Sequence, residues 1–150
     1  MKRFAAILLA TVCAFSLSAA QALTAECSAG GFSVWVPDHF ESVQIDPLFD
    51  QDLCFYWHGN KLAVQAYVSA QSGSDLFQVL TGSEEEYGPV SINGREMLYS
   101  MAKEFGKIRI SYSWMDQARG SSVTLEFTYS ADDPSVQSTV DKIISSISFN

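Results

Sequence analysis

The sequence predicts an α+β fold in which a single antiparallel sheet packs against an internal helix and a C-terminal amphipathic helix. Apolar and polar side chains alternate along residues 107–114 and again along 123–129, which is typical of strands with one buried face. Asn93-Gly94 favours a two-residue type I′ turn between two further strands. Apolar side chains recur at helical spacing along residues 136–147, and such a stripe has to pack on the sheet.

The other expected elements follow from turn and cap signals. Pro37 ends the alternation of the first strand, because proline lacks the N–H group that a strand donates. Ser74 and Asp75 are residue types that cap a helix, and Pro134 suits the first turn of another one. In chain order, we expect a strand at 32–36, a hairpin of 53–57 and 62–68, a helix that carries Leu76, Phe77, Val79 and Leu80 and ends before Gly88-Pro89, a hairpin of 90–92 and 96–101, the two alternating strands, and a final helix from Asp133.

The N-terminal segment has the three-part pattern of a secretory signal peptide. Lys2 and Arg3 precede an apolar run at 4–10, and Ala20-Gln21-Ala22 matches the small-residue cleavage site. The apolar run is shorter than the roughly 20 residues that a membrane-spanning helix needs. We therefore expect cleavage of residues 1–22 and a mature single domain of residues 23–150. This domain is expected to be secreted or periplasmic, without lipidation or membrane insertion.

The expected mature chain is strongly acidic. Cleavage removes two of the nine basic residues and none of the seventeen acidic ones, which leaves seven against seventeen and a formal net charge of −10. A polyanion is bound by clustered lysine and arginine side chains, so no nucleic-acid partner is expected. Docking on an anionic lipid surface is disfavoured for the same reason.

The cysteines of the expected mature chain predict one disulfide bond. Cys27 and Cys54 form an even pair in an oxidising compartment. In the chain-entropy model, closing a loop of about 28 residues stabilises a fold by about 3 to 4 kcal/mol. The alternative is a redox-active or nucleophilic thiol, which favours a C-x-x-C spacing or a neighbouring base, and the sequence shows neither.

No set of residues predicts a catalytic, cofactor-binding or metal-binding site. His39 and His58, the only two histidines, lie beside turn signals and match no ligand spacing, so a zinc site is the weaker interpretation. The G-x-S-x-G nucleophile motif of serine hydrolases is absent. The sequence therefore predicts a protein without enzymatic activity and without a cofactor.

Tyr56 and Tyr67 are the candidate partner-binding residues. Strand alternation places them opposite Phe55 and Val64, on the second face of the expected sheet. A protein or glycan partner would stack on their rings there. The alternative is that both rings pack in the core or under a helix.

Four segments together are similar to the PsbP-like fold superfamily. They are residues 32–40, the turn at 92–95, the two long strands around 116–121, and the closing helix and tail at 141–149. The match covers nearly the whole expected mature chain in its order of strands and helices, and contains no catalytic motif. The resemblance implies a PsbP-like sandwich of an antiparallel sheet flanked by helices. It also implies a small periplasmic or secreted protein that binds or assists another macromolecule.

Three functional hypotheses follow. The leading one is a secreted, non-enzymatic binding or accessory protein that recognises its partner through the second face of the sheet or residues 38–52. The first alternative is an inhibitor of a secreted or host enzyme, with a basic, lysozyme-like enzyme as the electrostatically favoured target. The second alternative is a small hydrolase with an unrecognised site.

Overall fold

The computed structural model describes residues 22–29, 31–37, 51–59, 61–69, 76–118 and 120–150. The predicted signal peptide, apart from Ala22, lies outside these residues, as do His39 and the whole segment 38–50. Within the described ranges, no helix is long and apolar enough to cross a membrane.

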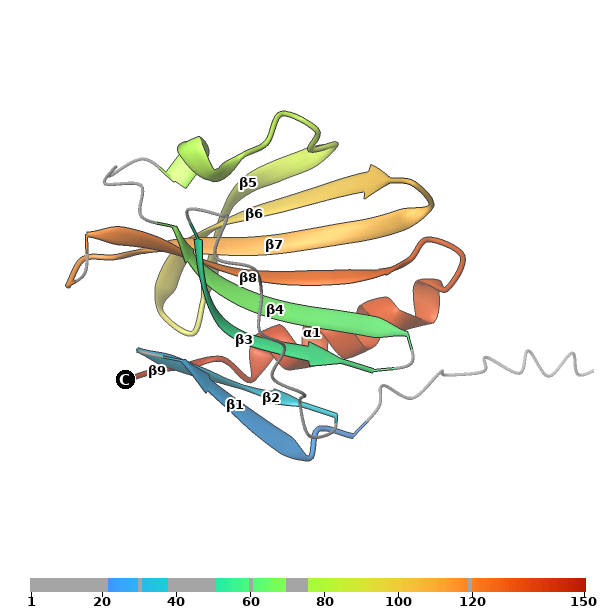
Figure 1. Cartoon of the computed structure of the whole chain (residues 1–150), viewed down its shortest axis with the longest axis horizontal. Coiled ribbons are helices and arrows are strands. Elements are labelled where there is room, and N and C mark those ends of the chain that lie inside the picture. Colours follow the sequence, from blue (N-terminus) through green and yellow to red (C-terminus); the bar gives the residue numbers. More distant parts are fainter. Residues whose placement is uncertain (1–21, 30, 38–50, 60, 70–75, 119) are drawn as a thin grey trace, which may run out of the picture.

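Two antiparallel sheets make up most of the described chain (Figure 1). The larger sheet has six strands in the order β3, β4, β8, β7, β6, β5, and the smaller has three in the order β1, β2, β9. Their bounds are β1 (Ala25–Ala29), β2 (Phe32–Val36), β3 (Gln51–His58), β4 (Leu62–Ser69), β5 (Glu86–Ile92), β6 (Arg95–Glu104), β7 (Lys107–Asp116), β8 (Ser121–Ser130) and β9 (Ser148–Phe149). The described helical elements are two 3-10 turns, η1 (Leu76–Val79) and η2 (Pro134–Val136), and one α-helix, α1 (Gln137–Ser145).

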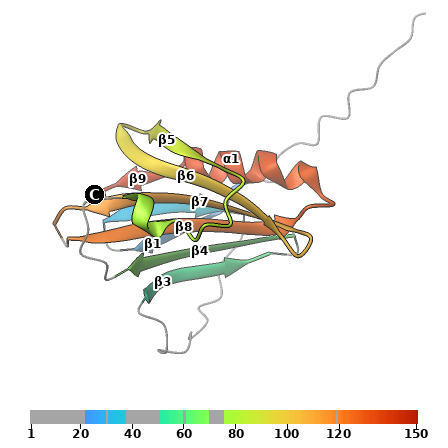
Figure 2. The same cartoon turned by 90° about the horizontal axis from the view of Figure 1, so that it is seen from above.

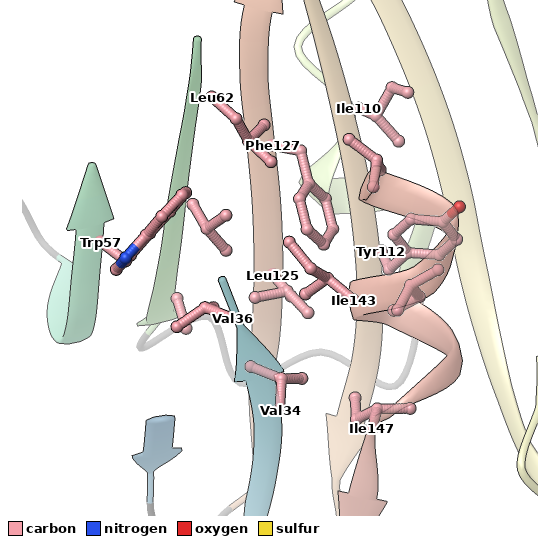
Figure 3. Close-up of a cluster of buried hydrophobic side chains, with 14 of the residues drawn as sticks. Val34, Val36, Trp57, Leu62, Ile110, Tyr112, Leu125, Phe127, Ile143 and Ile147 are labelled. Carbon is pink, nitrogen blue, oxygen red and sulfur yellow. The ribbon is translucent and has the colours of Figure 1, made fainter. Parts of the chain in front are cut away.

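One face of the six-stranded sheet carries the hydrophobic core. Leu125 and Phe127 of β8 are completely buried there, in a cluster that also contains Val34 of β2 and Ile143 of α1 (Figure 3). Helix α1 runs along this side of the large sheet (Figure 2). Apolar burial stabilises a fold by about 25 cal/mol per Å² removed from water, so this cluster holds β2 and α1 on the sheet.

The strand register confirms the two predicted alternating strands and both predicted hairpins. β7 and β8 pair so that Ile110 lies opposite Phe127 on the core face, while Ser111 lies opposite Glu126 on the other face. The hairpin predicted around residues 58–61 is β3–β4, and the one predicted around Asn93-Gly94 is β5–β6. Period-two alternation thus located the long strands correctly.

The predicted α+β class is wrong, because the described chain is mostly β with a single short α-helix. The internal helix expected from Ser74 and Asp75 is only the 3-10 turn η1. Gly82 follows it with φ +85°, a left-handed conformation that a right-handed helix does not contain. Gly88 and Pro89 fall inside β5, which is an edge strand and therefore tolerates a proline.

The expectation of a single sheet is also wrong. The strand predicted at 32–36 is β2, which pairs with β1 and β9 in a separate sheet. Helix α1 has only nine residues. The apolar face of the six-stranded sheet has to be covered, and a helix of this length covers only part of it. The small sheet covers the remaining part.

Two hairpin turns share a left-handed backbone but place different residues in it. In the β5–β6 turn, Asn93 (φ +49°) precedes Gly94, and its side-chain amide donates to the carbonyl oxygen of Ile147 at 2.7 Å. In the β6–β7 turn, Phe105 (φ +51°) precedes Gly106, and its side chain is fully exposed. A left-handed conformation costs an ordinary L-residue about 1–2 kcal/mol, and asparagine is one of the few that adopt it routinely. Phe105 is therefore the strained member of the pair.

We expect Phe105→Asn to stabilise the protein by about 1 kcal/mol, because asparagine tolerates the left-handed backbone and the exposed phenyl ring contributes no burial. Urea unfolding of the purified domain measures the change. The reciprocal variant Asn93→Phe is the control and should destabilise the protein, since it also removes the hydrogen bonds from the Asn93 amide to Ser145 and Ile147. Unchanged or lower stability of Phe105→Asn would contradict the strain assigned to this turn.

Candidate functional site

The second face of the six-stranded sheet, called here the polar face, combines polarity with burial. It carries residues 122, 124, 126 and 128 of β8 and the residues opposite them on β4 and β7. Buried polar groups cost free energy unless they are hydrogen-bonded, so a covered sheet face is ordinarily apolar. This face instead buries Ser100, Ser113, Ser122, Thr124 and Glu126.

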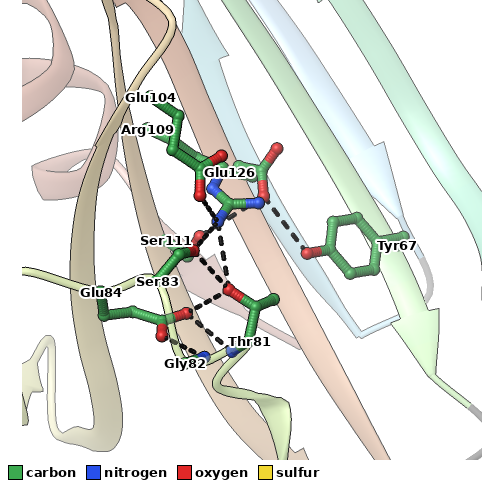
Figure 4. Close-up of polar contacts among 9 residues, drawn as sticks. All are labelled: Tyr67, Thr81, Gly82, Ser83, Glu84, Glu104, Arg109, Ser111 and Glu126. Carbon is green, nitrogen blue, oxygen red and sulfur yellow. Dashed lines mark hydrogen bonds and ion pairs between the residues drawn. The ribbon is translucent and has the colours of Figure 1, made fainter.

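Glu126 lies at the centre of the polar face with only 8% of its surface exposed (Figure 4). Gln65 donates its amide to Oε1 at 2.7 Å, and the Tyr67 hydroxyl donates to Oε2 at 3.4 Å. Ser111 donates to the same Oε2 at 3.5 Å. The strand register places these donors on β4 and β7, on either side of β8.

Burial decides the electrostatics of this cluster. It raises the pKa of Glu126 above its usual range, although Arg109 and the three hydrogen-bond donors act in the opposite direction. Burial, together with the Glu126 carboxylate, also raises the pKa of Tyr67. Both shifts reflect the cost of placing charge where water is excluded. The cluster is therefore a buried acid next to a tyrosine that stays protonated.

Residues 81–84, called here the strap, lie over this cluster (Figure 4). Arg109 donates from Nη2 to the hydroxyls of Thr81 at 3.3 Å and Ser83 at 3.2 Å. Glu84 accepts the backbone N–H groups of Thr81 at 2.8 Å and Gly82 at 2.7 Å, which fixes the turn at the end of the strap. Arg109 thus ties the strap to the sheet from beneath.

The space enclosed between the strap and the sheet is small. A cavity of about 20 Å³ lies between Thr81 and Glu84 on the strap and Tyr67, Arg109 and Glu126 on the sheet. Such a volume holds about one water molecule. A space of this volume does not hold a substrate, so this cluster gives the hydrolase hypothesis no support.

A much larger groove opens at one end of the polar face. It has a volume of about 560 Å³, within the range of ligand-binding pockets. It lies where the end of β3, the start of β4, the end of β8 and the β6–β7 turn meet. Its walls include Tyr56, His58, Lys61, Phe105, Lys107 and Asp133.

Aromatic rings and hydrogen-bonding groups share the walls of this groove. The rings of Tyr56 and His58 run nearly parallel, with centroids 6.2 Å apart and planes 21° from each other. Lys61 Nζ lies 2.6 Å from Asp133 Oδ2. Hydrogen bonds from Lys61 and Ser135 hold the pKa of Asp133 below its usual range. The groove therefore offers ring faces, a fixed ion pair and hydroxyl groups to an incoming molecule.

Basic and acidic side chains are paired around this end of the molecule. Lys61 pairs with Asp133. In addition, Lys103 Nζ lies 3.6 Å from Glu85 Oε2, and Arg109 Nη2 lies 3.7 Å from Glu104 Oε1. Exposed pairs of this kind contribute little stability, but they cancel charge locally. The groove end therefore carries charges of both signs, and Lys107 is a further basic side chain in its wall.

The structure places the two candidate tyrosines on the polar face but in different sites. Tyr56 lines the groove, whereas Tyr67 belongs to the buried cluster and donates to Glu126. His58 is an exposed wall of the groove. No group of three or more His, Cys, Asp or Glu side chains that could hold a metal ion occurs in the described part of the chain.

The predicted disulfide is not tested by the described side chains. Cys27 belongs to β1 and Cys54 to β3, but both side chains lie outside the described part of the structure. The bond between them stays a prediction.

Sequence reasoning missed Glu126, Arg109 and Phe105. Glu126 and Arg109 occupy polar positions of alternating strands, where a solvent-exposed side chain is the ordinary expectation. Phe105 carried a usable signal, because a phenylalanine precedes Gly106 between two strands, at a position where turns favour asparagine or aspartate.

Comparison with protein-family models and with curated proteins finds no match to this sequence. The resemblance to the PsbP-like superfamily accordingly stays a prediction.

We expect wild-type stability to fall relative to that of Glu126→Gln as the pH rises from about 4 to about 8. A raised folded-state pKa means that folding favours the protonated acid. The stability of wild type is therefore closest to that of Glu126→Gln below the pKa of a glutamate in the unfolded chain, about 4.3. It falls furthest below that of Glu126→Gln above the raised pKa of Glu126 in the folded protein. Urea unfolding across this pH range measures it, with Glu96→Gln, which removes an exposed carboxylate, as control. A difference that does not change with pH would count against a buried, proton-binding Glu126.

Proposed function

We propose that this protein is a secreted or periplasmic binding or accessory protein, without enzymatic activity of its own, that recognises a macromolecular partner through the groove. The groove itself is the observation that carries this proposal. It is open, it has the size of a ligand site, and it combines aromatic walls with hydrogen-bonding groups. The other polar site, around Glu126, has a volume of only about 20 Å³.

Tyr56 is the residue that we assign to recognition within the groove. Its ring stands beside His58 and is only partly buried, so an incoming group can contact it. Tyrosine is enriched among the residues that dominate binding energy, because its ring is large and rigid and its hydroxyl forms hydrogen bonds. Tyr67 is assigned a structural role, since its hydroxyl is engaged by Glu126.

The second candidate function is inhibition of a secreted or host enzyme. The formal net charge of −10 on the expected mature chain favours approach to a basic enzyme such as lysozyme. The fully exposed Phe105 at the tip of a hairpin is a feature that could enter an enzyme cleft. If micromolar concentrations of this protein lowered the activity of enzymes in a panel of secreted basic enzymes, the result would favour the inhibitor function over an accessory role.

We expect Tyr56→Ala to lower recovery of the native partner about tenfold, because truncation of an interfacial tyrosine costs on the order of 1–2 kcal/mol. Tagged protein is captured from its own extracytoplasmic fraction, and the bound molecules are quantified by mass spectrometry. Tyr87→Ala is the matched control, since Tyr87 is an exposed tyrosine of β5 that does not line the groove. Equal recovery with wild type and both variants would rule out recognition through the groove.

A further inference from the structure

The β6–β7 turn combines two unfavourable features at one residue. Phe105 has φ +51°, a conformation that is unusual for a bulky side chain, and its ring is fully exposed to water. The ring is not part of the hydrophobic core of the described residues, so burial in that core does not offset its exposure. The equivalent turn at Asn93-Gly94 shows that the same chain uses the favourable residue elsewhere. Such local conflicts concentrate at functional positions.

The tip that carries Phe105 is held in place. Its neighbour Gly106 accepts a hydrogen bond on its carbonyl oxygen from the backbone N–H of Ala131 at 2.9 Å, which ties the turn to the end of β8. β6 and β7 are paired up to Glu104 and Lys107, directly beside the turn. A contact residue on a rigid support loses little conformational entropy on binding.

The surroundings of the tip resemble the centre of a protein interface. Glu104 is paired with Arg109, and Lys61 is paired with Asp133, so part of the charge beside the ring is locally cancelled, while Lys107 adds an exposed positive charge next to the turn. Interface centres are depleted of uncompensated charge and enriched in aromatic side chains, which dominate the binding energy. The groove lies directly beside the ring, because Phe105 and Gly106 form part of its wall.

We infer that Phe105 is an anchor that a partner protein buries in an apolar pocket of its own, while the groove receives the segment beside that pocket. This inference rests on the proposed function, and it names the class of partner. A glycan offers no apolar pocket that encloses a phenyl ring. A membrane is disfavoured, because Phe105 is a single exposed ring on its turn and the chain is acidic. A second copy is disfavoured by repulsion between two acidic chains.

Photo-cross-linking tests the anchor directly. The full chain is produced with p-benzoylphenylalanine at position 105, and cross-linked in its own extracytoplasmic fraction. The control carries the same residue at position 77, where another exposed phenylalanine lies away from the groove. We expect a cross-link to one other protein from position 105 and not from position 77. The partner is identified by mass spectrometry and the binding is reconstituted with the purified protein.

Competition with unlabelled variants decides whether the phenyl ring matters. Unlabelled wild type and Phe105→Leu should abolish the cross-link, whereas at least tenfold more Phe105→Asn should be needed. Because Phe105→Asn is expected to be the more stable protein, unfolding cannot account for such a loss. Equal competition by Phe105→Asn, a cross-link only to a second copy or to lipid, or no cross-link to another protein would each overturn the anchor.

The contributions of the groove and of the Phe105 anchor are distinguished by measuring the binding of Tyr56→Ala and of Phe105→Asn in the reconstituted complex. Weakening by Tyr56→Ala alone supports the groove and overturns the anchor. Weakening by Phe105→Asn alone supports the anchor and contradicts recognition through the groove. We expect both variants to weaken binding.

Discussion

Strand β8 is the element on which the rest of the structure depends, because it is hydrogen-bonded along both edges and buried on both faces. β4 and β7 pair with it along nearly its whole length. Leu125 and Phe127 point into the core, while Thr124 and Glu126 are buried on the polar face. A register slip of one residue would exchange these two sets and place the Glu126 carboxylate in the apolar core. The alternation along β8 thereby fixes the register of the sheet and the positions of both candidate sites.

The polar face is closed at its centre and open at its end for a related reason. A buried network that contains a carboxylate has to be well hydrogen-bonded, so Glu126, its donors and the strap leave room for about one water molecule. At the end of the sheet, the polar groups are exposed and can form hydrogen bonds with water. The groove therefore lies where polar groups remain accessible to a partner. The central cluster supports the sheet from which the groove is built.

The sequence predicted those parts of the fold that local physics determines. Alternation at 107–114 and 123–129 and the Asn93-Gly94 turn located the central strands and one hairpin, because period and turn geometry are local properties. The internal helix failed, since a few apolar residues before Gly82 fit a helical turn without enough length to sustain a helix. The small sheet combines β1 and β2, which are neighbours in the sequence and of which only β2 was expected, with a contact between distant segments, Phe32 with Phe149, which no local pattern encodes.

The candidate sites were predicted less completely, because strand parity gives the face of a residue but not what covers that face. The alternation of side chains along the strands assigned Tyr56 and Tyr67 to the same face of the sheet. Only the structure shows that Tyr56 lines the groove while Tyr67 belongs to the buried cluster. The same limit applied to Glu126, because it shares its strand face with Thr124 and Thr128, and such a polar face suggested exposure to solvent. A sequence pattern therefore predicts orientation better than environment.

The two left-handed turns show how the fold and the binding surface impose different demands on similar backbones. Asn93 serves the fold, because its amide holds the chain after α1 against the β5–β6 hairpin. At the β6–β7 turn, the corresponding tie comes from the backbone of Gly106 and Ala131 instead. The side chain at position 105 is thus relieved of any structural role. A residue with no structural role can be chosen for contacts outside the molecule, even when its backbone conformation is unfavourable.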